Sequence, residues 1–449
     1  MKEKTNLNSY KLMIGFIVFV AILIRLLFII NTSIADYQYD VGIIKLESES
    51  DYNSLLNDNS NYLEARGFDY IMTIFHTGKL PQGTNGQFYH PPLNFALHAG
   101  LLSFLNLFPI QNSLKFEALQ ILPFIYSIIT IVYIYKLLNI FKLSDKSKIF
   151  VLLFWAFFPL AVFNSGTLNS DALVTMFIFM ATYYLVKWQE TSDTKDVIKL
   201  SLAIGLGANA KTQIIAFYVI CGIIYLYKLL RLLYNYQENK KSVKKIVLQG
   251  ILFFAISIPL VFAYQIRNLV LFNQAPFSIL EAKEELSTAG YSLYNRINLF
   301  SKELFTPVQK THNIWALTIH SANDFLLVSN LSTIFSMDML LVVFAWISLL
   351  SLIYLLLKKS NFEHTITIIS MIIIWLLSFF CFNLSMPYIC TAHARYIQII
   401  PLLSAVILGF LIDYNFKNKT TSKAISYILY ALMLLYSLLS LITIIQFVY

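Results

Sequence analysis

The sequence of 449 residues is too apolar for an ordinary soluble protein, because 58% of its residues are hydrophobic and only 13% are charged. Soluble domains carry about 25% charged residues. The excess of 33 Lys and Arg over 24 Asp and Glu gives a net charge of +9, but an apolar chain places its basic residues in cytoplasmic membrane loops, so nucleic-acid binding is not expected. The three cysteines lie far apart and indicate neither a disulfide framework nor a clustered metal site.

The first apolar run extends from Leu12 to Ile30 and follows Lys2, Lys4 and Lys11. Small residues after it imitate a signal-peptidase site, but the run is longer than the roughly 7 to 15 residues of a signal peptide's apolar core. We therefore expect a retained membrane anchor with its N-terminus in the cytoplasm.

Further apolar runs are long enough to cross about 30 Å of hydrocarbon, which takes roughly 20 residues. Together they predict an all-α polytopic membrane protein with about eleven transmembrane helices and its C-terminus outside. The expected spans lie near residues 11–30, 118–141, 149–165, 169–187, 196–210, 212–232, 246–266, 338–357, 365–386, 396–412 and 424–447.

A twelfth apolar segment, residues 92–108, is expected to enter the membrane without crossing it. Basic clusters are typical of cytoplasmic loops, and counting crossings back from them places both ends of residues 31–117 outside. A twelfth true span that violates the charge bias is the alternative. The clusters are Lys142, Lys146 and Lys148; Lys240, Lys241, Lys244 and Lys245; Lys358 and Lys359; and Lys417 and Lys419.

Two polar segments, residues 31–89 and residues 267–336, are expected to project on the extracytoplasmic side. They are much longer than ordinary connections, which have a median of about 4 to 6 residues, and we expect short helices within them. No separate soluble domain is evident, so residues 1–449 are taken as one integral-membrane domain. Frequent Ile, Lys, Asn and Tyr residues indicate a bacterial plasma membrane as the location.

The first outer loop holds Asp36 and Asp40, six to ten residues beyond the first span. A carboxylate held over the outer end of a helix is a candidate general base, provided that it lies within hydrogen-bond reach of an acceptor hydroxyl. The alternative for each single residue is a solvated surface charge.

The stretch from Gln87 to Leu93, Gln-Phe-Tyr-His-Pro-Pro-Leu, closes the same loop. Pro91 favours an extended conformation for His90, while Pro92 suits the first turn of a helix. His90 would then lie at a helix N-terminus, where free amides attract phosphate. An interfacial helix start with an incidental histidine is the alternative.

Basic residues at the outer ends of spans are exceptional under the positive-inside bias. Lys211, Arg267 and Arg395 occupy such positions. They are suited to clamp an anionic headgroup, since Arg offers bidentate contacts and Lys a point charge. The alternative is that each one extends to ordinary membrane phosphates.

Polar residues also fall within or between spans. Arg25 lies inside the first span, where a charge requires a partner or a polar cavity. Asn164, Asn169 and Asp171 occupy a short outer turn, where they either cap the following helix or line a cavity.

Three histidines, His90, His312 and His393, are too scattered in the sequence to form a metal-ligand set. No cofactor is therefore required by the sequence, and a divalent cation is possible but not indicated.

Taken together, these residues resemble integral-membrane glycosyltransferases of the C-type fold (GT-C), the superfamily of protein mannosyltransferases and aminoarabinose transferases. The resemblance covers most of the chain, and Tyr89-His90-Pro91-Pro92-Leu93 is its most specific element. It also rests on Asp40, Asn169 to Asp171, Lys211, Arg267-Asn268 and Arg395-Tyr396.

The resemblance implies a sugar donor carried on a polyisoprenyl phosphate, an inverting displacement and an active site that faces outside. It gives the role of catalytic base to Asp40, with Asp36 as the alternative and Asp69 as a weaker third candidate. The residues that it implies for substrate binding are Tyr89, His90, Asp171, Lys211, Arg267, Arg395 and Tyr396.

The other partners are membrane lipids and an acceptor, for which a glycan, a lipid and a protein all stay open. A secondary transporter or flippase for a lipid-linked or anionic substrate is the main alternative function. Transporters, however, commonly show paired repeats and Gly- or Pro-interrupted spans, and this chain has only 14 Gly and 11 Pro. A noncatalytic receptor for a lipid-linked glycan is a third interpretation.

Overall fold

The computed structural model describes residues 2–34, 48–57, 66–82, 86–277, 287–305, 311–324, 331–358, 364–417 and 423–448. Within these ranges the regular secondary structure is helical, apart from one isolated bridge between Ser287 and Tyr388. This confirms the predicted all-α class. The chain forms two compact units: the first comprises residues 1–28, 131–163 and 282–449, and the second comprises residues 29–130 and 164–281.

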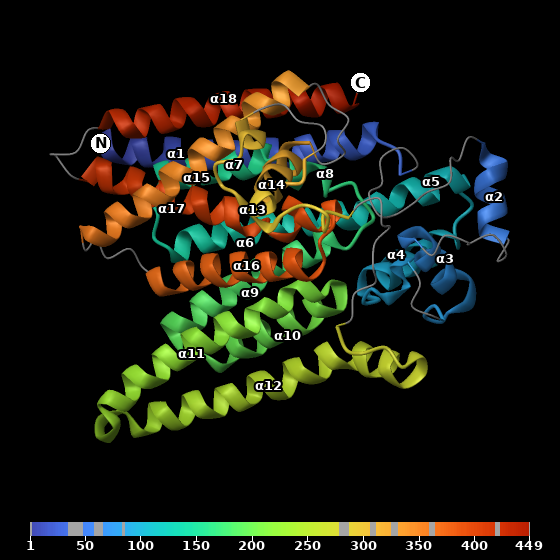
Figure 1. Ribbon diagram of the computed structural model, residues 1–449, viewed down its shortest axis with the longest axis horizontal. Helices are drawn as coiled ribbons and strands as arrows, with labels where there is room; N and C mark the ends of the chain where they lie inside the picture. The colour runs from blue at the N-terminus through green and yellow to red at the C-terminus, as the bar shows by residue number, and fades with distance from the viewer. Residues whose placement is uncertain are drawn as a thin grey trace. The chain divides into compact units, whose positions relative to one another are not determined.

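The first unit is a helical bundle in which α17 packs against α7, α15, α16 and α18, while α14 lies on α15 (Figure 1). Its elements are the start of α1 (Lys2–Asn31), the end of α6 (Ile121–Ile140), α7 (Asp145–Phe157), α8 (Pro159–Phe163), α13 (Leu293–Ile297), η5 (Lys302–Phe305), α14 (Ile314–Asn323), α15 (Leu331–Leu357), α16 (Thr365–Ser385), η6 (Ile389–Ala392), η7 (Ala394–Tyr396), α17 (Ile399–Lys417) and α18 (Lys423–Val448).

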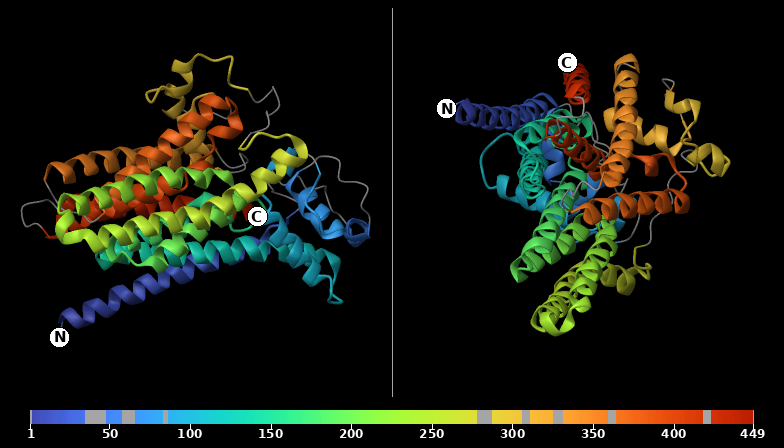
Figure 2. Two further views of the ribbon diagram at one scale, coloured as in Figure 1. Left: turned by 90° about the horizontal axis from the view of Figure 1, so that it is seen from below. Right: turned by 90° about the vertical axis from the view of Figure 1, so that its left-hand side faces the viewer.

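In the second unit α10 packs against both α9 and α12, α11 runs alongside α12, and α3 packs on α4 (Figure 2). Its elements are the end of α1, α2 (Glu49–Asn57), α3 (Gly67–Thr77), η1 (Gly86–Tyr89), α4 (Leu93–Leu105), α5 (Asn112–Glu117), η2 (Ala118–Gln120), the start of α6, α9 (Asp171–Thr191), α10 (Thr194–Ala210), η3 (Thr212–Ile215), α11 (Ala216–Tyr234) and α12 (Tyr236–Phe272).

Eight helical stretches in the described ranges are long and apolar enough to cross a membrane, which confirms a multi-pass membrane protein. They are Ser9–Asn31, Asn112–Ile140, Thr212–Tyr234, Tyr236–Phe272, Thr333–Leu357, Thr365–Ser385, Ile399–Lys417 and Lys423–Gln446. The expected number of eleven is not confirmed. The three other expected spans correspond to α9, to α10, which has 17 residues, and to the segment near residues 149–165. In this last segment α7 ends at Phe157, and a separate short helix, α8, begins at Pro159.

The twelfth apolar segment forms α4, which has 13 residues. Because a helix needs roughly 20 residues to cross the hydrocarbon, this length agrees with the prediction that the segment does not cross. Pro92 is the N-cap of α4, one position before the first turn in which we expected it. Short helices also occupy the described parts of both long polar segments.

Small residues allow α10 to pack closely against its neighbours. A Cβ atom added at Gly205 would lie 2.7 Å from Leu260 of α12, and one added at Gly207 would lie 2.9 Å from Phe177 of α9. The Asn209 amide then donates to the Leu260 carbonyl at 2.6 Å. The stretch of small residues before Lys211 therefore fixes the end of α10 between α9 and α12.

The partners of Arg25 are backbone carbonyls. Its side chain is fully buried and donates to the carbonyls of Trp155 at 3.1 Å and Ala156 at 3.1 Å. These carbonyls belong to the last turn of α7, and the residue four positions after Trp155 is Pro159, which has no N–H to donate. Ser440 donates to the neighbouring carbonyl of Phe157. Arg25 thus stabilises a helix C-terminus, where a positive charge is favoured.

Candidate functional site

The Phe88–His90 segment is held in place by two tyrosines of the second unit. The Tyr264 hydroxyl, on α12, donates to the Phe88 carbonyl at 2.9 Å, and the Tyr70 hydroxyl, on α3, lies 3.4 Å from the His90 carbonyl. The two hydroxyls lie 3.3 Å apart. The His90 side chain stacks on Tyr89 with ring centroids 4.2 Å apart. Elements distant in the sequence therefore fix the backbone of the Tyr-His-Pro-Pro motif.

Tyr70 lies in a dry aromatic environment. Its ring stacks on Phe95 with centroids 4.4 Å apart and meets the edge of Phe88 at 5.7 Å. Burial raises the pKa of its hydroxyl well above the usual range, and the neighbouring Tyr264 raises it further. Tyr70 therefore stays neutral and serves as a hydrogen-bonding anchor for the motif rather than as an acid or base.

A small polar pocket lies beside this motif in the second unit. Its volume is about 20 Å³, roughly the space for one water molecule. The motif, the start of α9 and the end of α10 contribute most of its wall. It is lined by Gly67, Gln87, His90, Phe95, Asn169, Ser170, Asp171 and Lys211. Three predicted substrate-binding residues, His90, Asp171 and Lys211, thus come together in one pocket.

Lys211 forms a buried ion pair with Asp171. Lys211 is 8% exposed and Asp171 is 0% exposed. This burial argues against the alternative in which Lys211 extends to ordinary membrane phosphates. The pair was not predicted, because the two residues are 40 positions apart, with Asp171 at the start of α9 and Lys211 just after α10.

Asn169 and Asp171 form the start of α9. The Asn169 side-chain oxygen accepts a hydrogen bond from the Asp171 backbone N–H at 3.0 Å, although the N-cap position itself is Ser170, and both Asn169 and Asp171 also line the pocket. Asp171 begins the helix, where the dipole stabilises its negative charge. Among the described residues, the Asn169 amide nitrogen has no hydrogen-bond partner although the side chain is 6% exposed. The pocket therefore contains an unused neutral donor beside the ion pair.

Arg267 belongs to the same unit but is not among the residues that line the pocket in the described part of the chain. Its guanidinium donates to the Asn268 side chain at 2.9 Å and to the Pro81 carbonyl at 3.1 Å. It also lies over the rings of Tyr264 and Phe272 at 5.7 Å and 5.3 Å. Arg267 thus connects the C-terminal end of α12 to the segment that precedes the motif.

Arg395 and Tyr396 belong to the first unit. The buried Arg395 guanidinium lies 5.1 Å from the Tyr396 ring centroid and donates to the Tyr396 hydroxyl at 3.3 Å. Trp375 donates to the Tyr396 carbonyl at 2.8 Å. These contacts fix the short turn η7 before α17.

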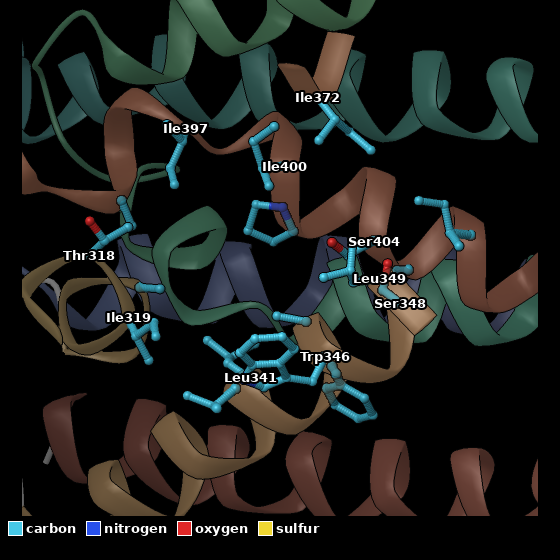
Figure 3. Close-up of a pocket in the computed structure, with 18 of the residues that line it drawn as sticks. Thr318, Ile319, Leu341, Trp346, Ser348, Leu349, Ile372, Ile397, Ile400 and Ser404 are labelled. Atoms are coloured by element: carbon cyan, nitrogen blue, oxygen red, sulfur yellow. The ribbon is translucent and has the colours of Figure 1, made fainter. Parts of the chain in front are cut away.

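A larger cavity of about 420 Å³ lies inside the first unit. Apolar side chains of α14, α15, α16 and α17 face it, including Ile319, Leu341, Ile372 and Ile400 (Figure 3). Two of its polar neighbours are engaged elsewhere, because Thr318 donates to the Ile314 and Ala392 carbonyls and the Trp315 indole N–H donates to the Ile297 carbonyl. The cavity therefore offers space for an apolar group and little recognition of charge.

The two leading candidates for the catalytic base, Asp36 and Asp40, lie outside the described residues. Asp69, the third candidate, accepts a hydrogen bond from the Arg66 backbone N–H at 2.9 Å and so caps the start of α3. This contact gives Asp69 a structural role. Within the described ranges, no three His, Cys, Asp or Glu side chains are grouped so that they could hold a metal ion.

The fold and the pocket define a multi-pass helical membrane protein with a buried cation and carboxylate beside a Tyr-His-Pro-Pro segment. Residues 90–263 match the sequence profile of the dolichyl-phosphate-mannose-protein mannosyltransferase family. This match confirms the predicted resemblance to the GT-C superfamily and supports a membrane glycosyltransferase of that type. No curated protein matches the chain.

Proposed function

We propose that this protein transfers a sugar from a polyisoprenyl-phosphate donor to an extracytoplasmic acceptor. The observation that carries the proposal is the pocket in which His90, Asp171 and Lys211 meet. All three lie within the segment that matches the mannosyltransferase family. A lysine in a polar pocket supplies positive charge for a phosphate oxygen, which takes the place of about one water molecule in the pocket.

The proposed reaction is a direct displacement at the anomeric carbon. An acceptor hydroxyl or amine attacks this carbon while the bond from the carbon to the phosphate oxygen breaks. Asp40, or Asp36 in its place, takes the proton of the acceptor as a general base. The polyprenyl phosphate leaves with the bonding electron pair, and the configuration of the sugar is inverted.

The pocket residues have separate parts in this proposal. Lys211 contacts the phosphate as a point charge, and His90 and the Asn169 amide supply hydrogen bonds. Arg267, in the same unit, extends the binding region to the rest of the donor or to the acceptor, and Arg395 and Tyr396 are proposed substrate-binding residues of the first unit. The site faces outside a bacterial plasma membrane, and the acceptor is a glycan, a lipid or a protein. Membrane lipids surround the spans.

The proposal is tested by replacing the base. Asp40→Asn and Asp36→Asn variants are assayed in membranes with a radiolabelled polyprenyl-phosphate sugar, and Asp69→Asn serves as the control for a structural carboxylate. We expect one of the first two variants to retain donor binding but to lose transfer. Full transfer by both variants would contradict the base assignment. Donor movement across the membrane without sugar transfer in the wild type would favour a flippase instead.

A further inference from the structure

Lys211 does not present a free positive charge to the pocket, because Asp171 already compensates it. The carboxylate side chain is 1% exposed and the lysine side chain 10% exposed, so water screens their interaction poorly. Asn169 holds the Asp171 backbone at 3.0 Å, and the start of α9 stabilises the carboxylate. Any anion that contacts Lys211 therefore also meets a fixed negative charge.

The two anions of the proposed reaction differ in charge. The donor is a phosphodiester, with one ester bond to the lipid and one to the sugar, and carries a single negative charge. The product is a phosphomonoester with a charge of about −1.5 to −2 near pH 7, because the second pKa of such a phosphate is about 6. A carboxylate beside the phosphate repels the product more strongly than the donor.

We propose that Asp171 is a specificity-determining residue that makes the Lys211 pocket select a singly charged phosphodiester over a doubly charged phosphomonoester. This inference rests on the proposed function and adds a role for the ion pair. Asp171 limits the charge that the pocket accepts, and so promotes release of the lipid phosphate after transfer. A pocket built only to bind phosphate would contain the cation without the buried carboxylate.

The test compares two short probes that differ in charge, farnesyl phosphate and its methyl ester, methyl farnesyl phosphate. Binding of each is measured at pH 8 by titration calorimetry with the full-length protein in lipid nanodiscs. The quantity of interest is the Kd of the monoester divided by the Kd of the diester. We expect Asp171→Asn to lower this ratio at least tenfold relative to the wild type, because the monoester gains most from loss of the carboxylate.

Asp196→Asn is the matched control. Asp196 is also buried and pairs with a lysine, Lys187, at 3.2 Å, but it does not line the pocket. A general effect of removing a buried ion pair would appear in both variants, whereas the proposed effect on the Kd ratio is confined to Asp171→Asn.

A second variant covers the case in which Asp171→Asn fails to fold. Ser170 precedes α9 and lines the same pocket, and Asp is favoured at the start of a helix. Ser170→Asp adds a second carboxylate, and we expect it to raise the Kd ratio at least tenfold. If both probes bind the wild type and the Kd ratio is unchanged in the folded variants, the proposed role of Asp171 is wrong, while the phosphate pocket of the proposed function is not affected. If neither probe binds the wild type, the phosphate pocket of the proposed function fails as well.

Discussion

Arg25 in the first unit and Lys211 in the second are both buried cations, but their charges are compensated in different ways. In the first unit Arg25 donates to the carbonyls of Trp155 and Ala156, which are neutral dipoles at the end of α7. In the second unit Lys211 pairs with the carboxylate of Asp171. Arg25 lies among packed helices, whereas Lys211 lines a pocket. Arg25, bound to carbonyls and lining no described pocket, therefore stabilises the fold. Lys211, paired with a carboxylate beside a pocket, is placed to contact a ligand.

The largest expected effect follows from removing the pocket cation. Lys211→Ala should lower the rate of sugar transfer by about 10² to 10³, the usual consequence of losing one preorganised contact to a developing anion. The rate is measured in membranes at saturating acceptor, with the amount of folded protein determined in parallel. Lys211→Arg keeps the charge and should retain more activity. Equal activity of the wild type and Lys211→Ala would show that Lys211, like Arg25, does not contact the ligand.

Loss of Arg25 should affect stability instead of chemistry. Arg25→Met fills much of the same space but leaves the carbonyls at the end of α7 without their charged donor, at a cost of about 3 kcal/mol in the free energy of unfolding. Denaturant unfolding in detergent measures this change. Ser440→Ala removes only a neutral donor to Phe157 and should cost about 1 kcal/mol. A large fall in kcat/KM of the folded Arg25→Met protein would contradict the comparison.

A smaller effect is expected at the anchor of the motif. Tyr264→Phe removes the hydrogen bond to the Phe88 carbonyl, which contributes about 1 kcal/mol. The His90 segment then moves more freely, and kcat/KM should fall about fivefold. Tyr225→Phe is the control, because it removes a similar bond to the Ile246 carbonyl outside the pocket. Identical kinetics in the two variants would show that the anchor does not act on the site.

The smallest effect concerns a third charged pair, His320 with Asp338. The His320 Nδ1 atom lies 3.0 Å from an Asp338 carboxylate oxygen, and Asp324 is 3.9 Å from Nε2. Burial opposes the imidazolium, but the hydrogen bond and charge of Asp338, with the charge of Asp324, outweigh it, so the pKa of His320 is raised above its ordinary 6.5.

This raised pKa gives stability a definite dependence on pH. The protonated form stabilises the folded state, so its contribution is fully present below about pH 6.5 and is lost as the pH rises through the higher pKa of the folded state. His320→Gln should remove this part of the dependence, as seen in the Tm between about pH 6 and pH 9. A Tm profile that is identical in the variant would show that His320 does not titrate with folding.

Much of the fold was predictable, because long apolar runs mark membrane helices directly. The interruption at Pro159 was missed, because the residues on both sides of the proline are apolar and were taken together as one span. The partners of Arg25 were also missed, because backbone carbonyls carry no sequence signal. Their position follows only from the break in α7.

Part of the candidate site was predictable from local sequence patterns. The sequence singled out His90, Asp171 and Lys211, each from its own local pattern, and the structure brings them into one pocket. The pairing of Lys211 with Asp171 depends on tertiary packing of α9 against α10, which no local pattern encodes. Arg267 was expected to clamp an anion, yet its observed contacts are with neighbouring protein groups. The role of Asp36 and Asp40 stays a prediction.

The hydrogen bond from Tyr264 to Phe88 also constrains the order in which the protein can be completed during synthesis. The two residues are separated by 176 positions, so the motif leaves the ribosome long before its anchor does. The loop that carries His90 reaches its final arrangement only after α12 has been inserted. A nascent chain arrested before α12 would hold every side chain of the pocket and the Tyr70 contact to the motif, but not the Tyr264 contact.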